Sequence, residues 1–385
     1  MTALLGGLTP ATFLKQHWQK RPLLVRQAIP GFSGLVDRDA FLALATREDA
    51  TSRLVIQHPK RPPHRRWERH DGPFGALDAT MLPARAWTLL VHGLESLVPG
   101  GWELLRHFDF IPAARVDDLM VSYATDGGGV GPHDDRYDVF LLQGPGKRRW
   151  QVSTQRDRAV DPHAAIRVLA DFRAEEEWVL EPGDMLYLPP GVAHHGIAEG
   201  ECFTYSIGFL APSHRTLVEE FLGYLGATLG ADIAEDALYA DPKLRPARAP
   251  YELPDDMLAQ VGDVLRGIRW DRGHVEEFLG RFLTRPKPHH RFDAPRRPLD
   301  EDAFARRMRQ KSTFRLALPT RGLVRGERVF LNGVAHEASR TALATFTLLF
   351  AARALPLPLP ASTLADRTTR RLLHEAYLAG YARLS

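Results

Sequence analysis

Apolar residues change their spacing twice along the 385-residue chain, near residues 117 and 212. Before residue 117 they recur at helical intervals or in short extended runs. Residues 58–75 are rich in Pro, Arg and His, lack periodicity and predict a loop. The pattern predicts helices over residues 10–18, 39–45 and 93–106, a strand over 23–25, and a buried strand or short helical turn over 87–91.

From residue 117 the apolar residues come in short runs rich in Val, Ile, Leu, Phe and Tyr. Clusters of Gly, Pro and Asp, such as residues 126–129 and 181–184, separate these runs. Short strands separated by such turn-forming clusters predict a β-sandwich or β-barrel. The predicted strands are residues 119–124, 136–143, 149–153, 177–180, 185–188 and 203–209.

After residue 212 helical spacing returns, and a basic, Pro-rich linker follows at residues 284–298. The three helices before the linker could form a small bundle or pair with another chain. The pattern after the linker resembles a winged helix. The predicted elements are helices over residues 214–229, 254–268, 272–284, 336–353 and 361–379, with strands over 313–318 and 328–331.

Composition narrows the class of protein. Hydrophobic content of 44% and charged content of 25% are ordinary for a globular protein. The single Cys202 excludes a disulfide framework and favours a reducing, cytoplasmic setting. We expect neither a secretory signal nor a membrane span, because no apolar run is long enough. The net charge of +3 is compatible with a ribonucleoprotein partner without identifying one.

Two short stretches carry candidate chemistry, Gly-Pro-His-Asp-Asp at residues 131–135 and Leu-Pro-Pro-Gly-Val-Ala-His-His at residues 188–195. His133, Asp135 and His194 supply two imidazoles and one carboxylate. This is the ligand set of the facial triad, which holds iron(II) and leaves three coordination positions open. The sequence therefore predicts an iron site.

The spacing within the two stretches resembles the two halves of the cupin signature, with Asp135 replacing the second His of the first half. In a His-x-Asp strand, residues two apart point to the same side and enter one cavity. The turn at residues 189–191 would aim His194 back across the barrel. The adjacent His195 could serve instead, but the cupin spacing selects His194.

An iron site of this kind needs a co-substrate, and 2-oxoglutarate can occupy two open positions while dioxygen takes the third. The distal carboxylate of 2-oxoglutarate then requires a cation in the cavity. The nearest candidates are Lys147, Arg148 and Arg149, of which at least one must form a solvated edge.

Residues 130–150, together with residues 183–191 and 13–25, resemble the JmjC-type ribosomal oxygenases, and more narrowly their bacterial arginine hydroxylases. The resemblance implies a mixed α/β fold with three parts. These are a double-stranded β-helix (cupin/JmjC) catalytic domain over residues 1–212 with its core at about 86–210, a helical dimerisation segment over 213–290, and a winged-helix-like domain over 291–385. It also implies a homodimer.

Carried over by residue, the resemblance makes His133, Asp135 and His194 the iron(II) ligands and pairs Arg148 with 2-oxoglutarate. Ser122 is the nearby hydroxyl, since Ala124 stands where the family tends to place one. The implied reaction couples oxidative decarboxylation of 2-oxoglutarate by O2 to hydroxylation of an arginine in a large-subunit ribosomal protein of the L16 type.

Charge alone suggests the substrate contacts, because acidic groups at the cavity mouth could pair with a guanidinium. The acidic candidates are Asp126, Asp134 and Asp138, and Tyr137 is a further candidate substrate contact. The ligand set leaves the target open, so the same chemistry on a ribosomal histidine is one alternative. Another is a metal-binding cupin regulator whose C-terminal domain binds nucleic acid, although residues 361–379 offer few basic groups for a phosphate-binding face.

Overall fold

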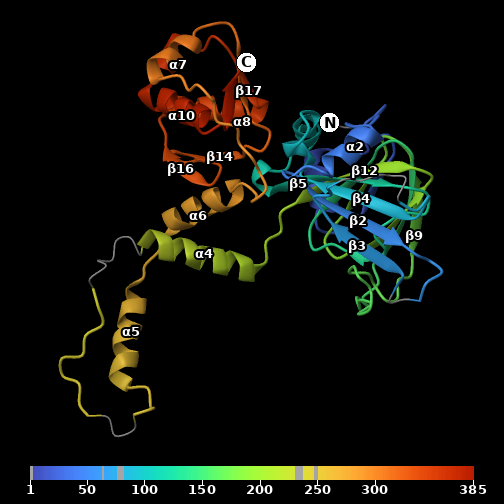
Figure 1. Ribbon diagram of the computed structural model, residues 1–385, viewed down its shortest axis with the longest axis horizontal. Helices are drawn as coiled ribbons and strands as arrows, with labels where there is room; N and C mark the ends of the chain where they lie inside the picture. Colours follow the sequence, from blue (N-terminus) through green and yellow to red (C-terminus); the bar gives the residue numbers. More distant parts are fainter. Residues whose placement is uncertain (1–2, 63–64, 76–81, 230–236, 247–249) are drawn as a thin grey trace.

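Twelve strands build the N-terminal part of the computed structural model, which describes residues 3–62, 65–75, 82–229, 237–246 and 250–385 (Figure 1). The strands are β1 (Leu23–Val25), β2 (Thr51–Gln57), β3 (Trp67–Asp71), β4 (Trp87–His92), β5 (Val116–Ala124), β6 (His133–Asp134), β7 (Val139–Gln143), β8 (Lys147–Ser153), β9 (Glu176–Leu180), β10 (Met185–Leu188), β11 (Ala193–Glu199) and β12 (Cys202–Phe209). They form an eight-stranded sheet, in the order β1-β10-β7-β12-β5-β4-β2-β3, and a four-stranded sheet, in the order β6-β11-β8-β9.

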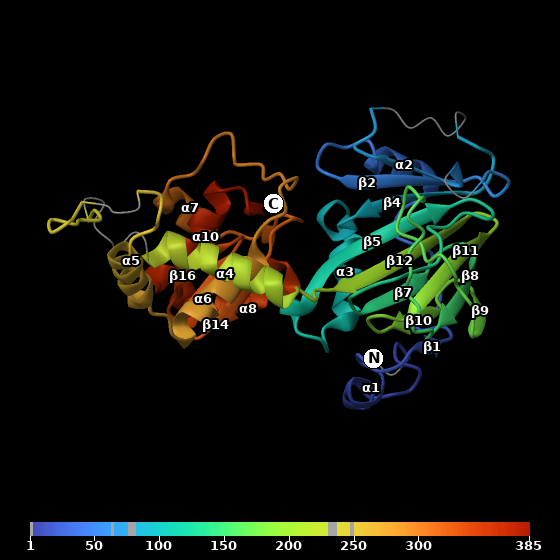
Figure 2. The same cartoon turned by 90° about the horizontal axis from the view of Figure 1, so that it is seen from below.

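The eight-stranded sheet buries its two faces differently, because successive side chains on a strand point to opposite sides. On the outer face, Tyr123 and Tyr187 pack in one apolar cluster with residues of the covering helices α1 (Pro10–Gln16), α2 (Arg38–Leu44) and α3 (Gly100–Leu105). On the inner face, Leu141 and Leu186 pack against Trp150 of the four-stranded sheet. The two sheets thus enclose an interior, as Figure 2 shows from below.

The predicted loop over residues 58–75 is wrong, because it contains β3. β3 pairs with β2, which the sequence pattern also missed. β3 is the edge strand of its sheet and carries Glu-Arg-His-Asp at residues 68–71, so little apolar alternation marks it. An Arg53–Asp71 ion pair of 3.0 Å joins the two strands on their exposed side.

Among the described residues, the C-terminal part begins with the helices α4 (His214–Leu229), α5 (Asp255–Gly267) and α6 (Arg272–Thr284). Two three-stranded sheets and four helices follow, around an apolar core that includes Phe304, Phe314 and Phe346. The helices are α7 (Glu301–Arg307), α8 (Arg340–Ala352), α9 (Ala361–Ala365) and α10 (Arg367–Leu378), and the strands are β13 (Thr313–Leu316), β14 (Gly322–Arg325), β15 (Arg328–Leu331), β16 (Val334–Glu337), β17 (Ala354–Pro356) and β18 (Ala382–Leu384). The exact limits of the three predicted domains stay a prediction.

Polar contacts join the two parts. The Trp102 Nε1–H donates to the Leu318 carbonyl over 2.8 Å. Arg321 forms an ion pair of 3.3 Å with Glu95, whose side chain is only 1% exposed. Arg321 also donates to the carbonyls of Val116 and Asp117, the first residues of β5. The start of β5 is therefore held by a residue of the C-terminal part.

Of the helices that the structure describes, none has the length and apolar character needed to cross a membrane.

Candidate metal centre

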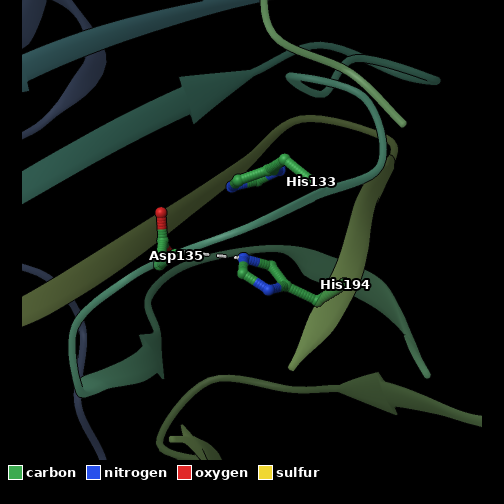
Figure 3. A group of neighbouring side chains, drawn as sticks. All are labelled: His133, Asp135 and His194. Carbon is green, nitrogen blue, oxygen red and sulfur yellow. Dashed lines mark ion pairs between the residues drawn. The ribbon is translucent and has the colours of Figure 1, made fainter. Parts of the chain in front are cut away.

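Three side chains from β6, β11 and the turn after β6 converge in the interior (Figure 3). β6 and β11 pair so that His194 lies opposite His133, with ring centroids 4.3 Å apart. The His194 Nε2 is 3.7 Å from the Asp135 Oδ2, and one ligand atom from each of His133, Asp135 and His194 lies within 4.8 Å of the others. The structure therefore brings together the three residues that the sequence spacing selected.

Asp135 reaches this position differently from the way the sequence predicted. β6 consists of His133 and Asp134 only, so Asp135 lies just beyond the strand. The Gly191 N–H donates to the Asp135 carbonyl over 2.7 Å and ties that turn to the segment before β11. Pairing of two segments, rather than strand alternation alone, places the carboxylate.

The hydrogen bonds of the two imidazoles set their tautomers. The His133 Nδ1 lies 2.9 Å from the Gly131 carbonyl, and the His194 Nδ1 lies 3.0 Å from the Val192 carbonyl. Because a carbonyl oxygen only accepts, each Nδ1 carries the proton and each Nε2 keeps a lone pair. Backbone partners of this kind are typical of metal-ligating histidines.

Burial, followed by the neighbouring His133, lowers the pKa of His194 to about 4. The imidazole is therefore neutral near pH 7, the state that binds a metal. His195 points to the other side of β11, where its ring meets Phe172 edge-on at 6.2 Å. Burial lowers the pKa of His195 to about 4 as well, but its ring is absent from the three-residue cluster.

Only one of the three predicted cations faces the interior. Lys147 and Arg149 lie on the surface, where Lys147 pairs with Glu181 at 2.6 Å and Arg149 pairs with Glu177 and Glu199. The Arg148 side chain points inward, is 3% exposed, and lies 5.8 Å from the Trp150 ring.

Within the described part of the chain, two nitrogen atoms of the Arg148 guanidinium lack a hydrogen-bond partner. Its Nε and Nη2 atoms are buried and form no hydrogen bond with any residue that the structure describes. Burying an uncompensated charge is costly, and an anion that accepts two hydrogen bonds would offset that cost. The donor set around the triad therefore fits a ligand with a carboxylate.

The inner faces of β5 and β12 add hydroxyl groups that line the same interior. Ser122 is 4% exposed and lies opposite Thr204, whose hydroxyl donates to Gln143 over 3.3 Å. Ser122 was predicted from the sequence as a site residue, whereas Thr204 and Ser206 were not. The sequence does indicate that Thr204 and Ser206 share one face of a strand, because they alternate with Phe203, Tyr205 and Ile207.

The four predicted substrate contacts lie in different environments. Asp138 is fully buried, and its carboxylate accepts from the Tyr187 hydroxyl at 2.6 Å and from Gln19 at 3.0 Å. Tyr187 belongs to the outer face, so Asp138 points away from the interior, and its contact with the substrate stays a prediction.

The other three keep their status as predictions. Asp126 pairs with Arg85 at 2.9 Å and is exposed. Asp134 pairs with Arg167 at 2.8 Å. Tyr137 is 40% exposed.

Asp118, which the sequence analysis missed, is a buried carboxylate beside Tyr137. A Cβ at Gly208 would lie 3.6 Å from the Asp118 Oδ1 and 3.8 Å from the Tyr137 ring, so the two side chains flank this glycine. The Asp118 Oδ2 lies 3.2 Å from the His92 Nδ1 and 3.8 Å from the Lys287 Nζ. Although burial opposes it, these two groups hold the pKa of Asp118 below its usual value.

Comparison with known proteins identifies the fold. Residues 103–217 match the JmjC domain family, and residues 267–383 match the ROXA-like winged helix. The chain is 32% identical over 323 residues to the ribosomal protein uL16 3-hydroxylase of Escherichia coli, covering 83% of each protein. It is 40% identical over 215 residues to a probable ribosomal oxygenase of Haemophilus influenzae, covering 55% of this chain and 52% of that protein.

A solved structure of the Escherichia coli ribosomal oxygenase YcfD in complex with cobalt and 2-oxoglutarate is 29% identical, covers 98% of both chains and has a TM-score of 0.79. Fold and cluster together define an oxygenase of the JmjC class. Within that class, the chain belongs to the ribosomal oxygenases. The predicted fold, a double-stranded β-helix core followed by helices and a winged helix, is confirmed.

The position of His195 makes it a matched control for His194. We expect His194→Ala to weaken Co(II) binding by more than the roughly 10–100-fold that loss of an outer partner costs, because a ligand atom is removed. His195→Ala should leave the affinity within about twofold, since His195 lies outside the cluster. Isothermal titration calorimetry measures the Co(II) affinity of the two variants. Equal losses of affinity would contradict the selection of His194 as the ligand.

Proposed function

We propose that the chain is an Fe(II)- and 2-oxoglutarate-dependent oxygenase that hydroxylates an arginine side chain of a large-subunit ribosomal protein. The observation that carries this proposal is the unpaired, buried Arg148 guanidinium in the same interior as His133, Asp135 and His194. The uL16 hydroxylase relative supports the ribosomal protein as the target.

In this proposal His133, Asp135 and His194 hold the iron. When bound, iron(II) would supply the redox chemistry that activates dioxygen, which is the oxidant of 2-oxoglutarate. Arg148 binds the distal carboxylate through its planar fork of N–H donors. The Ser122 hydroxyl lies on the inner face and is available to the same carboxylate, whereas the Thr204 hydroxyl already donates to Gln143.

Trp150 shields the metal side of the cavity. Its ring centroid lies 5.8 Å from that of His194. The ring also lies directly over Gly196, where any Cβ would approach it within 2.7 Å. A glycine at position 196 is therefore needed for the indole to cover His194 and exclude water from that side.

Asp118 favours an arginine over a neutral histidine as the target. Its buried carboxylate can accept from a guanidinium, and the Tyr137 ring beside it offers a face on which a guanidinium stacks. Asp126 and Asp134 remain outer candidates for the same peptide. A histidyl-hydroxylase relative from Drosophila persimilis is 27% identical over 304 residues, covering 72% of this chain and 39% of that protein, so histidine hydroxylation is a defined outcome of the test.

Mass spectrometry tests the activity. The chain is reconstituted with Fe(II) without oxygen and then mixed with 2-oxoglutarate, O2 and ribosomal protein uL16. We expect succinate and a gain of one oxygen atom that fragment spectra place on an arginine. Asp135→Ala should abolish both. An oxygen on histidine would refute the arginine target alone, whereas no succinate and no mass gain would refute the oxygenase and leave the metal-binding regulator.

Arg148 and Arg149 are adjacent, and only Arg148 faces inward, so they form a matched pair. We expect Arg148→Met to raise the KM for 2-oxoglutarate by roughly 30-fold or more, the equivalent of about 2 kcal/mol for hydrogen bonds to a charged group. Arg149→Met should change it by less than about twofold. Steady-state succinate formation measures both. Similar effects in the two variants would contradict the role of Arg148.

We also propose a cytoplasmic homodimer that forms through α4 and α5. α5 extends away from the rest of the chain (Figure 1), and Leu258, Val261 and Leu265 on one of its faces are 46–59% exposed. An apolar face of this kind favours burial against a second copy. The single buried Cys202 fits a reducing compartment.

Sedimentation tests the dimer. At micromolar concentration we expect twice the 43.2 kDa mass of one chain. The double variant Leu258→Glu/Leu265→Glu should sediment as a monomer, because it places four charges in the dimer interface. Gln260→Glu, on an exposed position of the same helix, should remain dimeric. A wild-type monomer would contradict the proposal.

A further inference from the structure

A second cavity, of about 530 Å³, lies where the two parts of the chain meet. Its walls come from residues 47–49 and α3 on one side, and from residues 291–293, β13 and β18 on the other. The residues of the metal cluster do not line it. Six arginines do, and we call this cavity the arginine cleft: Arg47, Arg106, Arg291, Arg315, Arg353 and Arg383.

The arginine cleft has an excess of positive charge. Only three carboxylates, those of Asp49, Glu103 and Asp293, line it beside the six guanidinium groups. Asp49 is already paired with Arg47 at 2.6 Å. Among the described residues, Arg106 and Arg291 find only backbone carbonyls as acceptors, at 2.7 Å from Ala351 and 3.1 Å from Pro288.

Two of the arginines form a cross-strand pair of like charge. In the antiparallel pairing of β13 with β18, Arg315 lies directly opposite Arg383. Directly opposite residues share a face, and like charges there destabilise a sheet. Both side chains are exposed, and within the described part of the chain neither has a carboxylate partner. An anion bound in the cleft would remove this repulsion.

Arg353 is a fixed cation in the wall of the cleft. Its guanidinium lies 4.2 Å from the Trp102 ring centroid and donates to the carbonyls of Ala317 and Leu318 at 2.7 and 3.0 Å. Burial, followed by the neighbouring Arg321, lowers the pKa of Arg353 to about 9, so the group still carries its charge at pH 7. Because its Nη atoms already donate to backbone carbonyls, Arg353 contributes a fixed positive charge to the cleft, which attracts an anion without further ordering of this side chain.

We propose that the arginine cleft binds phosphate groups, carried either by an RNA backbone or by a small phosphorylated molecule. Guanidinium groups bind phosphate oxygens through paired N–H donors, and several converge here. The volume lies within the range of ligand sites in proteins. This binding is separate from the oxygenase reaction and does not depend on it.

The test compares two double variants that remove the same charge. Arg315→Gln/Arg383→Gln changes the cross-strand pair of the cleft. Arg340→Gln/Arg367→Gln changes two exposed arginines on α8 and α10, which lie outside the cleft. The probes are a fluorescein-labelled single-stranded RNA of about 12 nucleotides, followed by anisotropy at several salt concentrations, and inorganic phosphate, followed by calorimetry. Uncoupled 2-oxoglutarate turnover verifies that both variants keep the catalytic fold.

We expect the cleft variant to bind RNA at least tenfold more weakly, with a salt slope smaller by about 1.4, or about 0.7 for each lost phosphate contact. The control should stay within about twofold of wild type. Phosphate binding that depends on Arg315 and Arg383, without RNA binding, would assign the site to a small molecule. Equal weakening by both variants, or binding of neither probe to wild type, would overturn the proposal.

Discussion

The register of β11 between β6 and β8 is the constraint on which the candidate site depends. It sets His194 opposite His133 on one side and opposite Val152 on the other, and it places Ala198 opposite Arg148. A shift of β11 by one residue would reverse the side chains of that strand, turning His195 inward and His194 outward. Trp150, which is buried in the apolar cluster between the sheets, resists that shift because its ring leaves no room for a side chain at Gly196, the residue opposite it. Apolar packing thus fixes where the polar groups of the site lie.

The two faces of the eight-stranded sheet have different roles, because the outer face stabilises the fold and the inner face carries polar groups of the candidate site. Its outer face carries the large aromatic cluster that includes Phe13, Phe140 and Tyr187, covered by the N-terminal helices. Its inner face carries Ser122, Thr204 and Asp118, whose polar side chains are costly to bury. The strongly apolar outer face can offset the cost of that polar interior. Such a division explains how a cavity with an unpaired guanidinium persists in a folded protein.

Sequence reasoning located the β-rich core, the helices after it and the three clustered residues, because each leaves a local signal. The paired half-motifs and the Gly- and Pro-rich turns can be recognised in the sequence without any knowledge of the fold. The edge strand β3 was missed because it carries four polar residues in succession. The orientation of Asp138 could not be predicted from the sequence, because its neighbours in the chain line the cavity whereas its own side chain points to the outer face and meets Tyr187. The role of Asp118 could not be predicted, because its environment is formed by His92 and Lys287, which are distant from it in the sequence.

The buried Glu95 ties the catalytic part to residues that are synthesised much later. Its carboxylate accepts the Leu119 N–H over 3.0 Å, while its cationic neighbours, Arg321 and Lys287, both follow the β-rich core in the chain. Burial raises the pKa of Glu95 above its usual value, whereas the neighbouring Arg321 favours its charged form. The cation that compensates this buried carboxylate therefore belongs to the C-terminal part of the chain. Without that part, the strand that carries Asp118 would be left beside a buried carboxylate that lacks its ion-pair partner, which is strongly destabilising.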